Sequence, residues 1–262
     1  MAQNTTSNRG YDDTVYIPRQ QRLRPMILTR KVQQFYLVYL CFPDGSEMQI
    51  AAYMMPNDGN WRANDAFYEE LIAFAKKYNI IILHDNAYSD IIYGGREGKS
   101  FLSYEGAKEV GVEFYSLSKS YNMTGMRISF ALGNKDVIQM FRKVRSQIDY
   151  GIFLPIQKAA VAALTGPQDN VKEQCRIYEE RNYALCRGMS SIGWKIPDGQ
   201  GTMFVWAPIL ENYTSSERFT LDLMEKTGMI VTPGSAFGDL GEGYVRMALV
   251  HPVPVIETAI AR

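Results

Sequence analysis

The sequence predicts an α/β protein, with a mostly parallel sheet covered by helices followed by a smaller α+β unit. Short runs of apolar and β-branched residues at 80–83, 112–116 and 128–132 are typical of buried strands. Segments with helical periodicity alternate with these runs, and such alternation indicates parallel strands joined by helical crossovers. After Gly193 the pattern changes to short strand-like runs around one helix, which indicates the second unit.

The elements of the first part follow from local composition. Residues 34–42 form a β-branched and aromatic run closed by Pro43-Asp44-Gly45, which is typical of a buried strand and a turn. Residues 64–78 are amphipathic, and Asn64 or Asp65 is suited to cap that helix. Further helices are expected over 135–147, 155–164 and 167–191.

The second part carries weaker local signals. A helix is expected over 216–227, and strand-like runs are found at 194–196, 202–206, 229–231 and 244–248. We therefore divide the chain into an irregular N-terminal segment (1–34), a large domain (35–165) and a C-terminal small domain (166–262) that includes the bridging helix.

Charge and cysteine content argue against several classes of function. Lys plus Arg equals Asp plus Glu at 28 each, so net charge does not favour nucleic acid or an acidic membrane surface as a partner. No apolar run is long enough to cross a bilayer, and residues 1–10 lack the apolar core of a secretory signal. The three cysteines and two histidines match no disulfide framework or metal motif. We therefore expect a cytoplasmic protein without a metal site.

The strongest chemical signal lies in residues 116–127, which follow a predicted strand directly. Loops after parallel strands are where open α/β sheets bind ligands. Hydroxyls at Ser116 and Ser118 and the guanidinium of Arg127 suit a phosphate dianion. In a partly dry pocket the amine of Lys119 can lose its proton and attack a carbonyl.

A second signal ends the preceding strand. Asp85 stands at its C-terminal end, where a carboxylate can hold a protonated pyridine nitrogen. Ala87 is small enough for a flat ring to lie on it, and Tyr88 can donate to a phenolate oxygen.

These two segments, 84–88 and 116–127, resemble the signature segments of the class I/II (fold type I) pyridoxal-phosphate aminotransferases. The similarity is greatest to the group that includes the LL-diaminopimelate aminotransferases, and it runs in order over roughly residues 64–262. Further segments that carry it are 163–169, 203–208, 231–238 and 241–246. The resemblance implies a type I pyridoxal-phosphate transferase fold with an incomplete large domain and a small C-terminal domain.

The resemblance also implies a role for each matching residue. Lys119 would carry pyridoxal 5′-phosphate as a Schiff base and move the proton at Cα. Asp85 would pair with the pyridine nitrogen, and Tyr88 with the 3′ oxygen. The phosphate would be bound by Ser116, Ser118 and Arg127.

The implied reaction is transamination between an α-amino acid and a 2-oxo acid. Arg246 would clamp the α-carboxylate of either substrate through two parallel hydrogen bonds. A homodimer is expected by the same resemblance, since these sites usually lie between subunits.

Upstream of residue 64 the family pattern is missing or altered. No glycine-rich phosphate loop and no intact Asn-Pro-Thr-Gly turn are found. Counting back from Asp85 at the family's spacing places the asparagine of that turn at Asn57, which joins the predicted cofactor-binding residues. The alternative places the turn near Asp44-Gly45, and residues 44–60 then read as an insertion or an unrelated stretch. Removing part of a parallel sheet would expose strand edges and apolar helix faces.

Two further readings stay open at this point. A β-lyase or decarboxylase of the same fold would use the same cofactor anchors, because substrate orientation selects the bond that breaks. A truncated, non-catalytic homologue would serve as an interaction or dimerisation module. For Arg246, the rival to a carboxylate ligand is a buried structural salt bridge.

Overall fold

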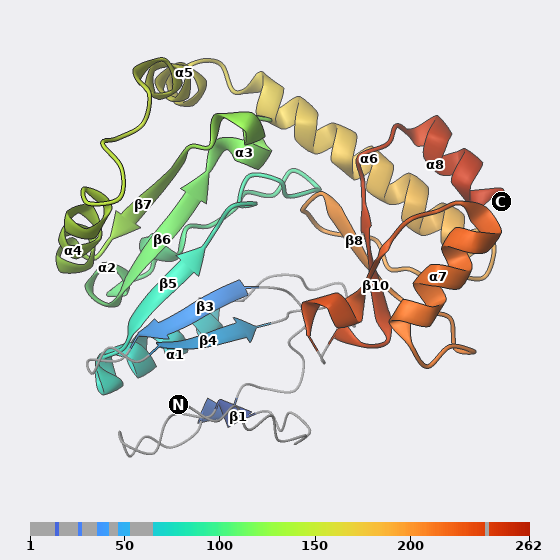
Figure 1. Ribbon diagram of the computed structural model, residues 1–262, viewed down its shortest axis with the longest axis horizontal. Coiled ribbons are helices and arrows are strands. Elements are labelled where there is room, and N and C mark those ends of the chain that lie inside the picture. The colour runs from blue at the N-terminus through green and yellow to red at the C-terminus, as the bar shows by residue number, and fades with distance from the viewer. Residues whose placement is uncertain (1–13, 16–25, 28–35, 42–46, 53–64, 239–240) are drawn as a thin grey trace.

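The computed structural model describes residues 14–15, 26–27, 36–41, 47–52, 65–238 and 241–262. The chain forms a five-stranded sheet with its helices and a smaller unit with a three-stranded sheet. The long helix α6 (Asp169–Ser191) joins the two (Figure 1). The strands β1 (Thr14–Val15) and β2 (Met26–Ile27) form a short antiparallel sheet of their own. The rest of the segment predicted to be irregular, 1–34, lies outside the described residues.

The larger sheet has the strand order β4-β3-β5-β6-β7. Strands β5 and β6 run parallel, whereas the other pairings of this sheet are antiparallel. The predicted α/β class is confirmed, but over the described strands the sheet is mixed rather than mostly parallel. The connections explain the difference, because residues 86–110 form a crossover between β5 and β6 while residues 117–128 reverse the chain between β6 and β7. The strands are β3 (Tyr36–Cys41), β4 (Glu47–Ala52), β5 (Ile81–Asp85), β6 (Gly111–Ser116) and β7 (Ser129–Gly133).

Local signals set the ends of several helices. The helix α1 (Asp65–Tyr78) begins with an acidic residue and has lysines in its last turn, as the helix dipole favours. Ser215 caps α7 (Ser216–Thr227), which ends at Gly228 with a left-handed φ of 74°. The other helices are α2 (Ala107–Val110), α3 (Leu117–Ser120), α4 (Lys135–Arg145), α5 (Leu154–Thr165) and α8 (Val253–Ile260), with 3-10 turns η2 (Phe101–Ser103), η3 (Thr124–Met126) and η4 (Gly234–Phe237).

The smaller unit is built on an antiparallel sheet in the order β8-β10-β9. Its strands are β8 (Phe204–Pro208), β9 (Thr232–Pro233) and β10 (Tyr244–Ala248). Side chains alternate between the two faces of β8 and β10. One face is buried in a core shared with α6, α7 and α8, and its sheet residues are Val205, Ala207, Val245 and Met247. The other face is only partly covered and carries Phe204, Trp206, Tyr244 and Arg246.

Two strand predictions in this unit are wrong. Residues 194–196 and 229–231 are irregular; Trp194, Ile196, Met229 and Val231 pack into or against the core instead of pairing, whereas Ile230 is exposed. Trp194, for example, closes the end of α6 by donating its backbone N–H to the carbonyl of Met189 at 3.0 Å. Its indole N–H donates to the carbonyl of Pro208 at 2.7 Å. Helix α8 was not anticipated from the sequence.

The loop after β5 is attached to the smaller unit. Ile91 and Tyr93 are buried in the core of that unit. The backbone N–H of Tyr93 donates to the carbonyl of Gln200 at 2.8 Å, and Thr202 donates to Ile91 at 2.7 Å. Gly201 permits this approach, because a Cβ there would lie 2.5 Å from the Ile91 carbonyl oxygen. The loop is therefore fixed at one end to the sheet and at the other to the smaller unit.

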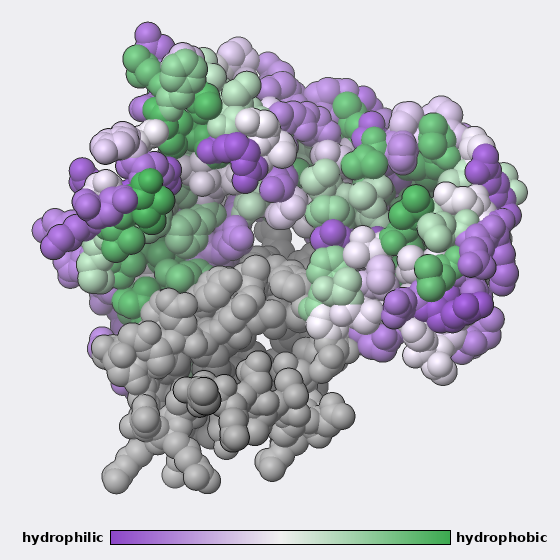
Figure 2. Space-filling model, viewed as in Figure 1, coloured by the Kyte–Doolittle hydropathy of each residue, from purple (hydrophilic) through white to green (hydrophobic). Residues whose placement is uncertain are grey.

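Apolar side chains stay exposed along β7, α4 and α5. Figure 2 shows them as green groups over this side of the molecule. None of the α4 side chains is buried, and Ala160 is the buried residue of α5. Among the described residues, no helix is both long and apolar enough to cross a membrane. The exposed residues of this apolar face are Leu132, Met140, Phe141, Val144, Ile148, Phe153, Leu154, Val161 and Leu164.

A buried polar pair, His84 on β5 and Glu113 on β6, joins these neighbouring strands. His84 Nδ1 lies 3.0 Å from Glu113 Oε2, and both side chains are buried. The same carboxylate accepts hydrogen bonds from the Ser100 hydroxyl at 2.8 Å and the Phe101 N–H at 2.7 Å. Burial raises the pKa of Glu113, but the bonds from His84 and Ser100 outweigh it and hold the pKa below its ordinary value.

We expect Glu113→Gln to lower the free energy of unfolding by about 1–3 kcal/mol at neutral pH, because buried donors lose a charged acceptor. The folded-state pKa of Glu113 lies below the unfolded value, so its carboxylate stabilises the fold above the unfolded pKa of about 4.3. That contribution is lost as the pH falls through the folded-state pKa, and the difference between wild type and variant shrinks in acid.

Urea denaturation of both proteins at neutral pH and in steps through the acidic range measures this difference. The control is Glu109→Gln, which breaks an exposed ion pair with Lys76 and is expected to cost about 1 kcal/mol or less. Equal losses for the two variants would contradict the role given to Glu113.

Candidate active site

The predicted site residues of the sheet gather at one edge. Asp85 ends β5 and Ser116 ends β6, and the parallel pairing of these strands brings their ends to the same edge. Asn86 donates its backbone N–H to the Phe114 carbonyl at 2.8 Å, which holds the outgoing chain against β6. Strand β7 starts opposite Ser116, so Arg127 arrives at this edge as well.

Lys119 lies in the short helix α3 and faces Tyr88. Its Nζ is 5.3 Å from the centroid of the Tyr88 ring. The Ser116 hydroxyl oxygen caps α3 by accepting the backbone N–H of Ser118 at 3.2 Å. Ser118 is buried, and its carbonyl accepts the Thr124 hydroxyl at 2.9 Å. The structure thus brings together Lys119 and Tyr88, and gives Ser116 a structural task in addition to any ligand contact.

Arg127 has an unusual backbone and an exposed side chain. Its φ is 52°, in the left-handed region that non-glycine residues rarely adopt. The guanidinium donates one hydrogen bond to the Thr124 carbonyl at 3.2 Å, within the same turn. Most of its donors therefore remain available at the sheet edge.

Arg246 reaches the site from the smaller unit. It lies on the partly covered face of β10, where its Cζ is 4.3 Å from the Phe204 ring centroid and 4.4 Å from that of Phe237. Desolvation lowers the pKa of Arg246, and the nearby Tyr88 opposes that shift. No carboxylate pairs with Arg246 among the residues that the structure describes, so a structural salt bridge does not explain it there.

Tyr88 is the meeting point of the two units. Its ring packs edge-on against Phe204, with centroids 6.0 Å apart. Burial raises the pKa of Tyr88, the charge of Arg246 lowers it, and that of Asp85 raises it. The phenol is therefore within electrostatic range of both charged residues, one from each unit.

The charged groups of this site form no ion pair with any residue that the structure describes. Over the described ranges, ion pairs join surface residues such as Lys99 with Asp65, whereas the site charges form none. The four groups are Asp85, Lys119, Arg127 and Arg246. The carboxylate is complementary to a basic nitrogen of a ligand, and the amine to a carbonyl carbon. The two guanidiniums are complementary to anionic oxygens. This donor set fits pyridoxal phosphate and a carboxylate substrate.

Asn57, the remaining predicted cofactor-binding residue, lies outside the described residues.

Asp90 was missed by sequence reasoning. Its Oδ2 accepts a hydrogen bond from Ser120 at 2.6 Å and another, shorter one from the Tyr115 hydroxyl. Ser120 follows Lys119 directly, and Asp90 lies two residues after Tyr88, so this carboxylate ties the two loops together. An Asp in a polar loop has no distinguishing local pattern, and only the fold reveals its partners.

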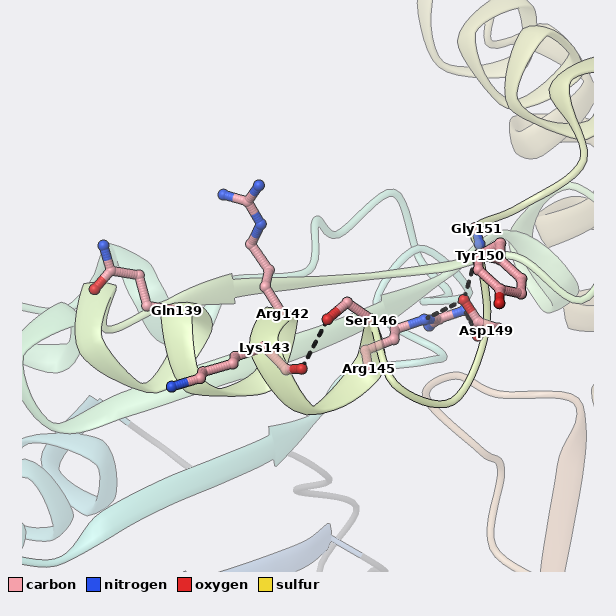
Figure 3. A pocket seen from close by; sticks show the side chains of 8 residues that line it. All are labelled: Gln139, Arg142, Lys143, Arg145, Ser146, Asp149, Tyr150 and Gly151. Carbon is pink, nitrogen blue, oxygen red and sulfur yellow. Dashed lines mark hydrogen bonds and ion pairs between the residues drawn. The ribbon is translucent and has the colours of Figure 1, made fainter.

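A separate hollow of about 660 Å³ lies along α4 and the turn after it, shown in Figure 3. It contains none of the predicted site residues. Its charged wall is partly neutralised by the ion pair of Arg145 with Asp149 at 2.9 Å. The lining residues are Gln139, Arg142, Lys143, Arg145, Ser146, Asp149, Tyr150 and Gly151.

We expect Asp90→Asn to lower the pKa of Tyr115. Burial and the hydrogen bond to the Asp90 carboxylate both raise that pKa, and the amide removes the negative charge while keeping an acceptor. Titration of ¹³C-labelled tyrosines by NMR measures the change. Asp149→Asn, at an exposed site beyond α4, serves as the control and leaves Tyr115 unchanged; an unshifted Tyr115 in Asp90→Asn would refute the tie.

Known proteins are similar to this chain in sequence and fold. The family of aminotransferases of class I and II matches the chain over residues 62–262. The LL-diaminopimelate aminotransferase of Halothermothrix orenii is 43% identical over 235 residues, which are 90% of this chain and 56% of that protein. The enzyme of the same name from Moorella thermoacetica is 45% identical over 196 residues, 75% of this chain and 50% of that protein.

Solved structures with a similar fold include further aminotransferases. Apo-BacF from Bacillus subtilis superposes with a TM-score of 0.73 at 37% identity, covering 76% of this chain and 53% of that one. A probable N-succinyldiaminopimelate aminotransferase from Thermus thermophilus gives 0.72 at 34% identity, covering 78% and 55%. The chain spans about half the length of these relatives. It belongs to the family of class I and II aminotransferases, whose members depend on pyridoxal phosphate.

Proposed function

We propose that this protein is a pyridoxal-phosphate-dependent aminotransferase that moves an amino group between an α-amino acid and a 2-oxo acid. The observation that supports the proposal is the meeting of Lys119 with Tyr88 at a sheet edge whose charged groups form no ion pair within the described part of the chain. Membership of the family supplies the reaction class.

The predicted site residues that the structure describes each have a task in this proposal. Asp85 holds the proton on the pyridine nitrogen, and Tyr88 donates to the ring oxygen. The bound cofactor supplies an electron sink for the charge that develops at Cα. Lys119 would take the proton from Cα and return it, since an amine in this pocket is suited to general base and acid work. The phosphate is held by Ser116, Ser118 and Arg127.

Arg246 has the remaining task of binding the substrate α-carboxylate. Its planar fork of N–H donors matches the two oxygens of a carboxylate. Because the curated relatives are named LL-diaminopimelate aminotransferases, LL-diaminopimelate is the first amino acid to test.

We also propose that two copies of the chain associate and that the protein works in the cytoplasm. Support for association comes from the exposed apolar face on β7, α4 and α5, because contiguous apolar surface favours a protein partner. The free thiols of Cys175 and Cys186 suit a reducing compartment. Light scattering after size exclusion tests the association.

The same apolar face favours one competing function, that of a non-catalytic interaction module. A β-lyase or decarboxylase of this fold differs from the proposed enzyme only in its product. Analysis of the products formed from several amino acids separates β-lyase and decarboxylase activity from transamination.

We expect the chain mixed with pyridoxal phosphate to show a near-visible absorption band that Lys119→Ala abolishes, because the amine is the group that binds the aldehyde covalently. Transamination by the variant should fall by several orders of magnitude. Lys195→Ala, at an exposed lysine of the smaller unit, is the control and retains both the band and the activity. A band that survives in Lys119→Ala would sink the assignment, and a wild type without a band would favour the interaction module.

A further inference from the structure

Aromatic rings flank Arg246, and no acidic residue of the described part of the chain pairs with it. Its guanidinium is partly buried, with the rings of Phe204 and Phe237 centred 4.3 Å and 4.4 Å from Cζ. Across the residues that the structure describes, none of its N–H groups donates to a protein acceptor. Burying a cation without a hydrogen-bond acceptor costs free energy. One explanation must therefore account both for the two rings beside Arg246 and for the absence of a described acceptor.

Other arginines of the chain show that this arrangement is not the general one. Arg181 donates to the carbonyls of Leu249 and Val250 at 2.9 Å and 3.2 Å. Arg96 donates to the Gln200 side chain at 2.7 Å. Both guanidiniums donate to protein acceptors contributed by distant parts of the chain. Arg246 differs because aromatic rings stand where an acceptor would be expected.

Rings and carboxylates stabilise a cation in different ways. A carboxylate would neutralise the charge and occupy two N–H donors, whereas an aromatic ring attracts the cation through its quadrupole and takes up no donor. The five donors of the guanidinium therefore stay free for a ligand. A planar anion with two oxygens is the ligand that such a group recognises best.

We infer that Phe204 and Phe237 are positioning residues that hold the guanidinium of Arg246 in place without neutralising it, so that it receives the α-carboxylate of the substrate. The inference rests on the proposed function, within which it identifies the groups that make Arg246 a carboxylate receptor.

The two rings are tied to different parts of the molecule. Phe204 packs against Tyr88, which in turn lies beside Lys119, so contacts run from the reactive amine to the guanidinium. Phe237 packs edge-on against Trp206 within the smaller unit, with centroids 5.5 Å apart. Phe204 is therefore expected to influence the distance between the amine of Lys119 and the guanidinium of Arg246. Phe237 is expected to influence the guanidinium alone.

The turn that carries Phe237 is fixed by a close backbone approach. A Cβ on Gly234 would lie 1.9 Å from the Gly241 carbonyl oxygen and 2.6 Å from that of Tyr244. Glycine thus lets η4 lie directly against the start of β10. This contact places the Phe237 ring over the side chain of Arg246, which lies on β10.

The test compares Phe204→Leu and Phe237→Leu with the wild type, all loaded with pyridoxal phosphate. Calorimetry measures the dissociation constants of pyruvate and of pyruvamide, which lacks the carboxylate. Steady-state kinetics of transamination measures kcat and the KM for pyruvate. We expect each substitution to weaken pyruvate binding and raise KM by about fivefold or more, with pyruvamide unaffected, because only the anion needs the cation in place. Phe237→Leu should leave kcat within about twofold, and Phe204→Leu should lower it further.

Two matched variants separate positioning from packing. Phe219→Leu removes a ring that is buried with Trp194 and Tyr213 in the core of the smaller unit, and should reduce stability without changing pyruvate affinity. Phe237→Tyr keeps a ring over the guanidinium and should restore binding.

Unchanged pyruvate affinity in both leucine variants, or equal losses for pyruvate and pyruvamide, would overturn the inference. If the wild type shows no near-visible band with the cofactor, the proposed function fails. The difference between pyruvate and pyruvamide then still decides the role of the rings, so the two failures are distinguishable.

Discussion

Parallel pairing of β5 with β6 sets the positions of the groups around Lys119. It brings Asp85 and Ser116 to one edge, from which the chain continues to Tyr88 on one side and to Lys119 on the other. The same two strands are joined inside the fold by His84 and Glu113. Because leaving a buried hydrogen-bonding group without its partner is costly, this pair resists separation of the strands that carry the site.

The site concentrates uncompensated charge, which has an energetic cost for the free protein. Salt bridges elsewhere on the described surface neutralise their members, but none between described residues neutralises the four charged groups of the site, which are Asp85, Lys119, Arg127 and Arg246. The fold offsets part of this cost with rings, through Tyr88 near Lys119 and through Phe204 and Phe237 near Arg246. Groups of this kind reduce stability while the site is empty and are stabilised when a complementary ligand binds.

Much of the fold and of the site could be predicted because it is encoded locally. The helix at 216–227 has a capping serine and a terminal glycine, and its bounds were predicted to the residue. The position of Asp85 at a strand end and of Lys119 just after a strand could be read from alternating apolar runs, and the structure brings both to one edge.

What could not be predicted depends on contacts distant in sequence. The direction of β3 and β7 in the sheet depends on how their connections fold, and no local pattern distinguishes a reversal from a crossover there. Apolar residues at 194–196 satisfied the criteria for a strand, yet tertiary packing used them as core. The roles inferred for Phe204 and Asp90 arise from neighbours contributed by other elements, and neither residue type signals them.

The attachment of the loop after β5 to the smaller unit has a mechanical consequence. Ile91 and Tyr93 are anchored in the core of that unit, and Tyr88 precedes them by only a few residues. A rotation of the smaller unit about α6 would therefore strain the loop that carries Tyr88, because Asn86 and Asp90 hold the same loop to β6 and α3. Such a motion would carry Arg246 with the smaller unit, while Lys119 stays with the sheet. The distance between the amine of Lys119 and the guanidinium of Arg246 thus depends on the angle between the two units, and this loop restricts that angle.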